Sequence, residues 1–424
     1  MKVLVVGGGG REHALAWRLA QSPLVTELMA APGNAGIASI ARCVPIDPND
    51  VSEVVGLAER ERVDLTVVGP EAPLVVGLAD ELAARGLAAF GPSRAAARIE
   101  GSKAWTKELL TRHGIPTARA GTFTALAPAV AFVDEMGGRA VVKADGLAAG
   151  KGVTVAAGRD EAISALQDAL VGRTFGDAGT TVVVEEVLEG PEVSAFALCD
   201  AETLVPFQLS RDFKRAGDGD TGPNTGGMGA YSPVPSIGAG LERRIWSEAV
   251  VPAWEAMRAE GIAYRGLLYA GVMLTADGPK VLEFNCRFGD PETEAVIPRL
   301  RTDLAELLLA SATDRLAEAK VDWSPDRAVT VVLTSGGYPG EHAVGAEIRG
   351  LEREDDDVFV FHAGTMGLDG RVVTVGGRVL AVTALGTTLH EARERAYDAC
   401  GRIEFDGMQY RRDIAETAAE GESR

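Results

Sequence analysis

The sequence predicts a protein of mixed class, α/β in its first hundred residues and α+β beyond them. Three observations carry this prediction. Near the N-terminus, short apolar strands alternate with helical patterns, which is typical of a parallel, doubly wound sheet. The middle of the chain mixes strands and helices without that alternation, and past Trp323 strands are separated by glycine turns. We therefore expect three domains, 1–101, 102–325 and 326–424, the last mainly antiparallel β.

The first domain shows the clearest alternation. Its expected strands are Val3–Val6, Leu28–Ala31 and Leu65–Val68, and its expected helices are Glu12–Gln21 and Leu74–Arg85. Ligands of doubly wound sheets bind beyond the carboxyl ends of the strands. The loops at these ends read GGGGRE, PGNAG and GPEAP, so we expect a ligand site there.

The second domain is expected to open with a helix at 102–113, and residues 120–188 are predicted to form a small α+β unit. The other expected elements are strands Ala140–Ala144 and Thr181–Leu188 with helix Asp160–Leu170 between them, strands within 192–208 and 264–285, and helices at 240–260 and Thr293–Thr313. The glycine-rich stretch 216–231 is either a mobile lid or a long surface connection, and its length favours a lid.

The third domain contains the strand patterns AVTVVLTSGGYPG, VFVFHAG and RVLAVTALG, and a polar tail is expected from about Ile414. The glycine turns between these strands favour antiparallel pairing, because antiparallel neighbours need only short connections.

The composition of the chain argues against several classes of protein. The chain has 424 residues and a formal net charge of −19, which makes nucleic-acid and membrane-surface binding improbable expectations for it. Four separated cysteines with no C-x-x-C pair argue against a zinc site or a disulfide framework and fit a reducing cytosol. The start MKVLVV is expected to be a strand and not a signal peptide. We therefore expect a cytoplasmic protein.

The first glycine loop, Gly7–Gly10, does not fit a dinucleotide fingerprint. G-x-G-x-x-G would place its third glycine at position 12, where Glu12 stands. A phosphate at the N-terminus of the following helix remains plausible, because free backbone N–H groups favour anions there. The alternative is a tight strand–helix turn without a ligand, and four consecutive glycines favour the phosphate.

The second glycine loop, Gly146–Gly152, is not a Walker A motif, because GLAAGKG has three residues between its glycines where four are needed. Glycines at 146, 150 and 152 nevertheless allow backbone amides to approach phosphate oxygens. Lys143 on the preceding strand and Lys151 in the loop supply positive charge. A strand lysine is more often a snorkelling surface residue, but its place beside this loop favours a function.

The segment EFNCRFGD places Glu283, Asn285 and Arg287 on one face of a strand, because strand side chains alternate. Carboxylate and amide oxygens suit Mg²⁺, and a guanidinium suits a substrate carboxylate. The alternative is a salt-bridged polar face of a half-buried strand.

Weaker signals lie elsewhere. Glu185 and Glu186 end an apolar strand and are candidates for a hinge that offers backbone groups to an adenine. Asp212 and Lys214 precede the glycine-rich stretch. The histidines lack metal or triad spacing, and His13 is expected to cap or pack.

Ordered motifs along the whole chain carry a resemblance. They are GGREHALAW (9–17), APGNAG (31–36), GPEAPLV (69–75), EGSKAWTK (100–107), KADGLAAGKGV (143–153), DTGPNTGGMGAYSP (220–233), EFNCRFGDPET (283–293) and GGRVLAVTALG (376–386). In these segments the chain resembles the ATP-grasp ligases, and specifically the glycinamide ribonucleotide synthetase family.

The resemblance implies an ATP-grasp central domain with 120–188 as a small mobile lid. It implies a reaction in which ATP, glycine and 5-phosphoribosylamine give ADP, phosphate and glycinamide ribonucleotide through a glycyl phosphate, the second step of purine synthesis. Mg²⁺ or Mn²⁺ would assist, the partners would be small molecules, and a monomer is expected.

The resemblance also implies roles for single residues. Arg287, Lys143 and Asp212 are expected to be catalytic, with Arg287 on the glycine carboxylate and Asp212 on its ammonium group. The expected ATP-binding residues are Lys103, Lys143, Gly146, Gly150, Lys151, Gly152, Glu185, Glu186, Val187 and Lys214. The expected substrate-binding residues are Gly9, Gly10, Asn34, Glu71, Asp212, Arg287, Asp290 and Pro291, and the expected metal ligands are Glu283 and Asn285.

Three alternatives stay open at this point. Another ATP-grasp enzyme that phosphorylates a different carboxylate, such as bicarbonate, would need no glycine. A nucleotide-binding regulatory module would have lost Glu283, Asn285 or Lys143, and all three are present. An NAD oxidoreductase is opposed by the missing third glycine.

Overall fold

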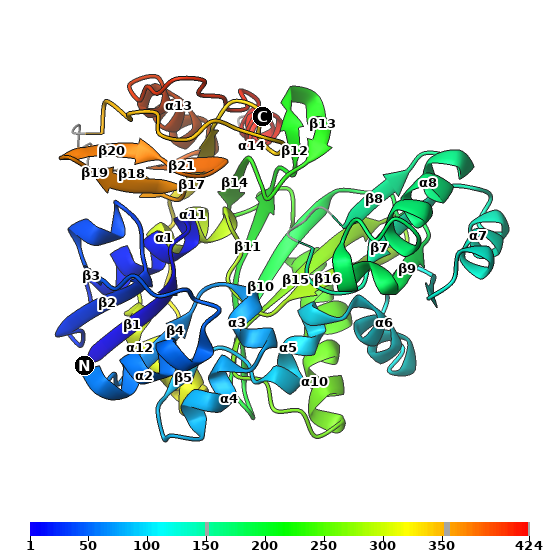
Figure 1. Ribbon diagram of the computed structural model, residues 1–424, viewed down its shortest axis with the longest axis horizontal. Coiled ribbons are helices and arrows are strands. Elements are labelled where there is room, and N and C mark those ends of the chain that lie inside the picture. The colour runs from blue at the N-terminus through cyan, green and yellow to red at the C-terminus, as the bar shows by residue number, and fades with distance from the viewer. Residues whose placement is uncertain (149–151, 352–356, 423–424) are drawn as a thin grey trace.

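A computed structural model describes residues 1–148, 152–351 and 357–422 (Figure 1). The N-terminal part is a five-stranded parallel sheet in the order β3-β2-β1-β4-β5. Its strands are β1 (Lys2–Gly7), β2 (Glu27–Pro32), β3 (Arg42–Cys43), β4 (Leu65–Val68) and β5 (Ala89–Phe90). The helices around it are α1 (Gly10–Leu19), α2 (Val51–Glu61), α3 (Glu71–Val75), α4 (Leu78–Ala83) and α5 (Arg94–Gly101).

The doubly wound prediction for this part is confirmed. Along β1, Leu4 and Val6 belong to one hydrophobic cluster while Val3 and Val5 belong to another. A strand buried on both faces is typical of a parallel sheet covered by helices on either side. One expected helix is wrong: Leu74–Arg85 is divided into α3 and α4, because Gly77 adopts a left-handed backbone conformation with φ +97°.

The small unit expected at 120–188 is a four-stranded antiparallel sheet in the order β6-β9-β7-β8. It has its own apolar core between the sheet and two helices. Its elements are β6 (Ala120–Phe123), α7 (Leu126–Glu135), β7 (Ala140–Ala144), β8 (Val153–Ala156), α8 (Arg159–Leu170) and β9 (Val182–Glu185). Figure 1 shows this unit on the right, on the far side of the molecule from the N-terminal sheet, and α6 (Lys103–Arg112) leads into it.

The largest sheet has eight strands in the order β16-β15-β10-β11-β14-β17-β21-β18, all paired antiparallel. From the central part come β10 (Glu192–Cys199), β11 (Leu204–Asp212), β14 (Gly229–Ser232), β15 (Gly266–Thr275) and β16 (Gly278–Asn285). From the C-terminal part come β17 (Arg327–Thr334), β18 (Val358–His362) and β21 (Arg378–Gly386), with α13 (Leu389–Cys400) packed on them. The antiparallel C-terminal prediction is confirmed, but the predicted boundary at 326 separates strands that share one sheet.

The glycine-rich stretch contains more structure than a lid or a connection implies. It forms a hairpin of β12 (Arg215–Gly217) and β13 (Thr221–Asn224), followed by β14. Strand β14 is buried and pairs antiparallel with β11 on one side and with β17 on the other. The stretch therefore links the central and C-terminal parts of the large sheet.

Two predicted helices are interrupted. The helix expected at 240–260 consists of α9 (Ala239–Arg244), a π-helical segment (Ile245–Val250) and α10 (Val251–Ala259). The helix expected at Thr293–Thr313 is divided into α11 (Glu292–Val296), a 3₁₀ turn (Ile297–Arg299) and α12 (Leu304–Ala312). Pro298 lacks the N–H that a continuing helix needs, and the carboxylate of Asp303 accepts the first N–H groups of α12.

Three smaller features complete the fold. Strands β19 (Thr365–Leu368) and β20 (Arg371–Thr374) form a two-stranded sheet. The predicted polar tail is wrong, because Ile414 is fully buried and α14 (Glu416–Glu422) follows it. Among the described helices, none combines the length and the apolar character that crossing a membrane requires.

Candidate active site

The polar face of β16 has the predicted alternation. Phe284, Cys286 and Phe288 are buried, whereas Glu283, Asn285 and Arg287 on the other face stay partly accessible. The carboxylate of Glu283 is surrounded by positive side chains, which lower its pKa against the opposing effect of burial; they belong to Lys214, Lys143, Lys103 and Arg287. Glu283 is therefore an anion held among four cations.

Lys143 lies where β7 of the small unit meets β16. Its ammonium group donates to the backbone oxygen of Leu282 at 3.0 Å and pairs with Glu185 at 3.1 Å. The same carboxylate pairs with Lys107 at 3.2 Å. Burial lowers the pKa of Lys107 to about 8, although Glu185 opposes this shift. Sequence reasoning did not single out Lys107, since its helical position looks like an ordinary surface site.

Lys103, at the start of α6, donates to the backbone oxygen of Gly146 at 2.9 Å. Burial lowers its pKa, and the nearby Glu283 counteracts that effect. Asp145 accepts the N–H of Ala104 at 3.1 Å, so the second glycine loop is tied to the N-terminus of α6. The chain turns at Gly146 with φ +103°.

Of the other predicted residues in this loop, only Gly152 lies within the part of the chain that the structure describes. Gly150 and Lys151 lie outside the described residues. Gly152 is described, and its backbone oxygen accepts the N–H of Ala144 at 2.8 Å. A Cβ at this position would lie 2.6 Å from the Cβ of Ala148, so glycine is required there.

The residues of the expected adenine hinge make several contacts within the fold. The side chain of Glu185 is turned inward to the two lysines. The N–H of Glu186 donates to the backbone oxygen of Arg119 at 2.9 Å, and its carboxylate accepts the N–H of Arg119 at 3.0 Å. The backbone N–H of Glu186 is thus engaged within the fold, and Val187, two residues past the end of β9, comes next along the chain.

Asp212 and Lys214 are brought to the same face as Glu283. Lys214 pairs with Glu192 in a short contact and lies 3.9 Å from Glu283. Burial, assisted by Glu292 and Glu192 and opposed by Lys214, raises the pKa of Asp212 to about 8. Glu192 was missed by sequence reasoning, because its role depends on the pairing of β10 with β15.

Arg287 is held by two carboxylates. Its guanidinium donates to Glu71 at 3.2 Å and to Glu100 at 3.0 Å, and it also donates to the amide oxygen of Asn285 at 3.2 Å. Glu100 further accepts the N–H of Cys286 at 2.7 Å. Glu100 lies in the last turn of α5, where the helix dipole disfavours an acidic side chain. That mismatch was the signal in the sequence for a partner elsewhere in the fold.

The three loops at the strand ends of the N-terminal sheet meet as predicted. The side-chain amide of Asn34 donates to the backbone oxygen of Gly8 at 2.9 Å and to that of His362 at 2.6 Å. The N–H of Gly9 donates to the carboxylate of Glu12 at 2.6 Å. The N-terminus of α1 therefore already receives one anion from the chain itself, the carboxylate of Glu12.

Charged side chains from the central and C-terminal parts of the chain lie next to the first glycine loop, Gly7–Gly10. Arg378 pairs with Asp290 at 3.0 Å and donates to the backbone oxygen of Asp290 at 2.8 Å. A Cβ on Gly10 would lie 2.4 Å from Oε1 of Glu294, which is fully buried. Burial and the neighbouring Asp290 raise the pKa of Glu294 well above its ordinary value, while Arg378 helps to lower that of Asp290. Arg378 and Glu294 were not among the predicted site residues.

Pro291, which follows Asp290 in the sequence, packs against the glycine-rich stretch 216–231. A Cβ on Gly227 would lie 2.3 Å from the Cδ of Pro291. The site thus receives residues from every part of the fold: loops of the N-terminal sheet, lysines of the small unit and α6, the polar face of β16, and Arg378 from the C-terminal part.

The donors on β16 fit a divalent cation. Glu283 is anionic and its side chain is 34% exposed, and Asn285 offers an amide oxygen on the same face of the strand. Within the described residues, no group of three or more His, Cys, Asp or Glu side chains forms a complete metal cage. A site with one carboxylate and one amide suits Mg²⁺, which usually completes its shell with water and substrate phosphates.

Comparisons with known proteins agree along the whole chain. Three family models match it: the N domain of phosphoribosylglycinamide synthetase over residues 1–100, its ATP-grasp (A) domain over 101–293 and its C domain over 328–417. A phosphoribosylamine–glycine ligase of Vibrio parahaemolyticus is 50% identical over 98% of this chain and 97% of its own length. The Salmonella typhimurium protein of the same name is 51% identical over the full length of both.

Solved structures extend the comparison. The crystal structure of phosphoribosylamine–glycine ligase from Thermotoga maritima superposes with a TM-score of 0.84 at 34% identity, over 98% of this chain and 100% of that one. Biotin carboxylase from Campylobacter jejuni, at 13% identity and a TM-score of 0.77 over 99% of this chain and 95% of that one, shares the fold alone. The chain belongs to the phosphoribosylglycinamide synthetase family.

Proposed function

We propose that the protein joins glycine to 5-phosphoribosylamine at the expense of ATP, giving glycinamide ribonucleotide, ADP and phosphate. The observation that carries this proposal is the arrangement around Glu283, where one carboxylate lies among Lys103, Lys143, Lys214 and Arg287. Such a site can neutralise a polyphosphate and a second anion side by side, which phosphoryl transfer to a carboxylate requires.

The ATP phosphates would lie over Lys103 and Lys143, beside the glycine loop with Gly146 and Gly152. Gly150 and Lys151 of that loop are proposed to contribute an amide and a further charge. Glu283 and Asn285 would hold a divalent cation, for which we propose Mg²⁺ with Mn²⁺ as a substitute. When bound, the cation supplies additional charge neutralisation at the phosphate oxygens.

We propose that the carboxylate of Glu185 has a role of its own, beside the backbone hinge role expected from its sequence position. It pairs with both Lys107 and Lys143 and so holds the two ammonium groups in place. Val187 and the backbone oxygens beside it are the proposed neighbours of the adenine, because the N–H of Glu186 is engaged with Arg119.

Glycine would bind between Arg287 and Asp212. Its carboxylate pairs with the guanidinium after exchanging with an existing partner, and Glu71, 27% exposed, is more accessible than Glu100 at 8%. Asp212 receives the ammonium group once it has released its own proton. The two contacts fix both ends of the amino acid and orient the carboxylate toward the γ-phosphate.

The reaction then has two steps. A carboxylate oxygen of glycine attacks the γ-phosphorus of ATP, the bond to the β-phosphate oxygen breaks, and ADP leaves. The amine of phosphoribosylamine attacks the carbonyl carbon of glycyl phosphate, the C–O bond to phosphate breaks, and the nitrogen loses a proton. Side chains contribute by positioning and by neutralising charge.

The ribose phosphate would be received by the loops at the N-terminal sheet, with Gly9, Gly10, Asn34 and Glu71 in proposed contact. Asp290 and Pro291 adjoin the same loops from the central part. This arrangement is supported by the contacts of Asn34 with Gly8 and His362, which hold the loops together at one edge of the sheet.

We further propose a cytoplasmic monomer. Cys199, Cys286 and Cys400 are buried free thiols whose pKa is raised by burial, so they stay protonated and suit a reducing compartment. Light scattering of the purified protein at micromolar concentration tests the oligomeric state, and a mass of twice 44.3 kDa would refute the monomer.

The decisive experiment measures ADP release with Mg²⁺–ATP while glycine or phosphoribosylamine is omitted in turn. Dependence on both, with glycinamide ribonucleotide as the product, is expected. ADP release that needs bicarbonate and ignores glycine would refute the proposed substrates.

A further inference from the structure

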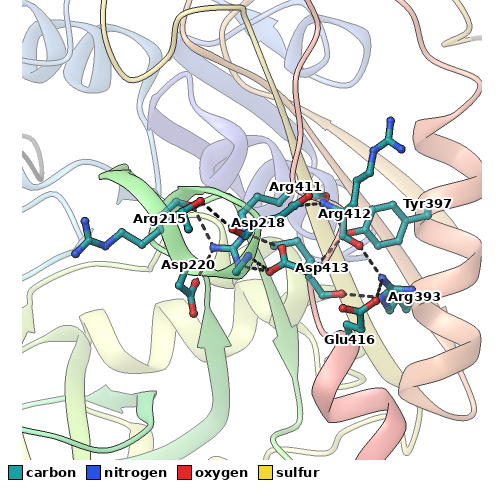
Figure 2. Close-up of polar contacts among 12 residues, drawn as sticks. Arg215, Asp218, Asp220, Arg393, Tyr397, Arg411, Arg412, Asp413 and Glu416 are labelled. Carbon is teal, nitrogen blue, oxygen red and sulfur yellow. Dashed lines mark hydrogen bonds and ion pairs between the residues drawn. The ribbon is translucent and has the colours of Figure 1, made fainter.

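The hairpin of β12 and β13 is fastened to a C-terminal segment, residues 411–413, that is almost two hundred residues away in sequence (Figure 2). Backbone and side chains both take part. Four hydrogen bonds join them: Arg411 to the carboxylate of Asp220 at 2.7 Å, Arg411 to the backbone oxygen of Arg215 at 3.1 Å, the N–H of Arg412 to Asp218 at 2.8 Å, and the N–H of Gly219 to Asp413 at 2.9 Å.

Arg411 is the centre of this contact. Its side chain is only 1% exposed, yet it carries a full charge. Asp413 accepts two of its N–H groups, at 2.8 and 2.6 Å. Its guanidinium carbon lies 5.0 Å from the centre of the Phe213 ring, within the range of a cation–π contact. The guanidinium thus joins the hairpin, the C-terminal segment and Phe213 at one point.

Phe213 lies between Asp212 and Lys214, the two charged residues of the proposed glycine and phosphate site. Side chains alternate along extended backbone, so Phe213 faces Arg411 while its neighbours face away from it. Lys214 accordingly reaches Glu192 and Glu283. Arg411 therefore packs on the side of residues 212–214 from which the Phe213 ring projects, opposite to the side on which Asp212 and Lys214 project.

Backbone bonds make this support stiff. The N–H of Phe213 donates to Gly229 at 3.0 Å and its oxygen accepts the N–H of Met228 at 2.8 Å. The oxygen of Lys214 accepts the N–H of Thr225 at 2.7 Å. We therefore expect a displacement of the hairpin to reach Lys214 and its neighbours through these backbone hydrogen bonds.

A purely structural role is the competing explanation for Arg411. A buried arginine paired with carboxylates is weak evidence for added stability, because an apolar side chain of similar volume often serves as well. Such a group is better suited to fixing the relative position of the segments that it joins. The planar guanidinium can donate to Asp413, Asp220 and the Arg215 oxygen at the same time only when these acceptors are held in one arrangement.

We propose that Arg411 is a positioning residue for the reaction: through Phe213 and the hairpin, it sets the orientation of Asp212 and Lys214 and thereby the binding of glycine. This inference rests on the proposed function, because it assigns glycine to Asp212. It gives the C-terminal part of the chain, through Arg411, a role in the binding of glycine.

The test compares Arg411→Met with Asp220→Asn. Arg411→Met removes the positive charge and the hydrogen-bond donors of the guanidinium group. Asp220 is 64% exposed and has φ +53°, a conformation that asparagine also accepts, so this variant preserves the fold. The control is Arg395→Met, which removes a partly exposed arginine paired with Asp357 and Glu391 within the C-terminal part. Each KM is measured for glycine, ATP and phosphoribosylamine.

We expect the KM for glycine to rise about tenfold in Arg411→Met and about threefold in Asp220→Asn, because small misplacements of positioning groups have effects of this order or larger. The KM for phosphoribosylamine should stay within about twofold, and all three values should stay near wild type in Arg395→Met.

Equal rises in all three KM values in Arg411→Met, or unchanged glycine KM in a folded variant, would overturn the inference. If Arg411→Met does not fold, Asp220→Asn decides alone by the same criterion. A wild-type protein that releases ADP without glycine would instead refute the proposed function, so the two failures are distinguishable.

Discussion

His13 and His362 should make the protein sensitive to acid at the contact between the N-terminal sheet and the C-terminal part. Nδ1 of His13 accepts the backbone N–H of His362 at 2.7 Å, so this nitrogen has to remain unprotonated. Both rings are buried, and they meet edge to face with centroids 5.5 Å apart. The pKa of His13 is lowered to about 3, first by burial and then by His362, and burial lowers the pKa of His362 to about 4.

The sign of the effect follows from these shifts. Because both pKa values are lower in the folded state than the ordinary 6.5, the unfolded chain binds more protons below that pH. The stability is therefore complete above pH 6.5 and is lost as pH falls toward 4 and then 3. Between pH 7 and pH 4.5, each histidine lowers the free energy of unfolding by about 2.5 kcal/mol at 1.36 kcal/mol per pKa unit.

Together the two residues account for about 5 kcal/mol, which is a large part of the typical stability of a protein. The experiment compares urea unfolding of wild type and His13→Gln at the two pH values. A glutamine oxygen can still accept the His362 N–H but does not titrate, so the pH-dependent loss should shrink by about 2.5 kcal/mol. His390→Gln is the matched control, since the side chain of His390 is 61% exposed and pairs with Glu394 in its own helix.

An unchanged pH dependence in His13→Gln would refute this reasoning, as would an equal reduction in the His390→Gln control. Loss of the pH dependence in both variants would mean that histidine titration in general, and not burial at this contact, governs acid stability.

The remaining predictions concern the site itself. Glu283→Ala should abolish turnover with an unchanged circular dichroism spectrum, because it removes the proposed metal carboxylate; a near-wild-type rate would remove that assignment. Asp212, with its pKa raised to about 8, should make the KM for glycine fall as pH rises from about 6.5 to about 8.5, since only the ionised form attracts ammonium; Asp212→Asn should lose this dependence. Gly10→Ala should lower the free energy of unfolding by about 1–3 kcal/mol, because its Cβ would lie 2.4 Å from Glu294. Gly240→Ala is its control, since the Cβ there meets open space, and an equal loss in both would contradict the clash.

Local patterns made several features predictable. The alternation of Glu283, Asn285 and Arg287 with buried neighbours follows from the period of a strand, which depends on no distant residue. The parallel sheet followed from apolar strands alternating with helices, and the meeting of its loops followed from the polarity of those strands.

The interrupted helices mark the limit of that reasoning. Apolar periodicity continued through Pro298 and Gly77, so each pair of helices looked like one. The break depends on whether a proline or a left-handed glycine is tolerated at that position, and packing decides this more than propensity does.

The sequence by itself determined the fold class, the polar strand and the two glycine loops, because these depend on neighbours a few residues apart. Only the tertiary structure decided which charges meet. Glu100 reaches Arg287 across 187 residues and Arg411 reaches Asp220 across 191. Such partners leave little trace in local sequence, because a buried charge can be satisfied by any opposite charge that the folded chain brings within about 4 Å.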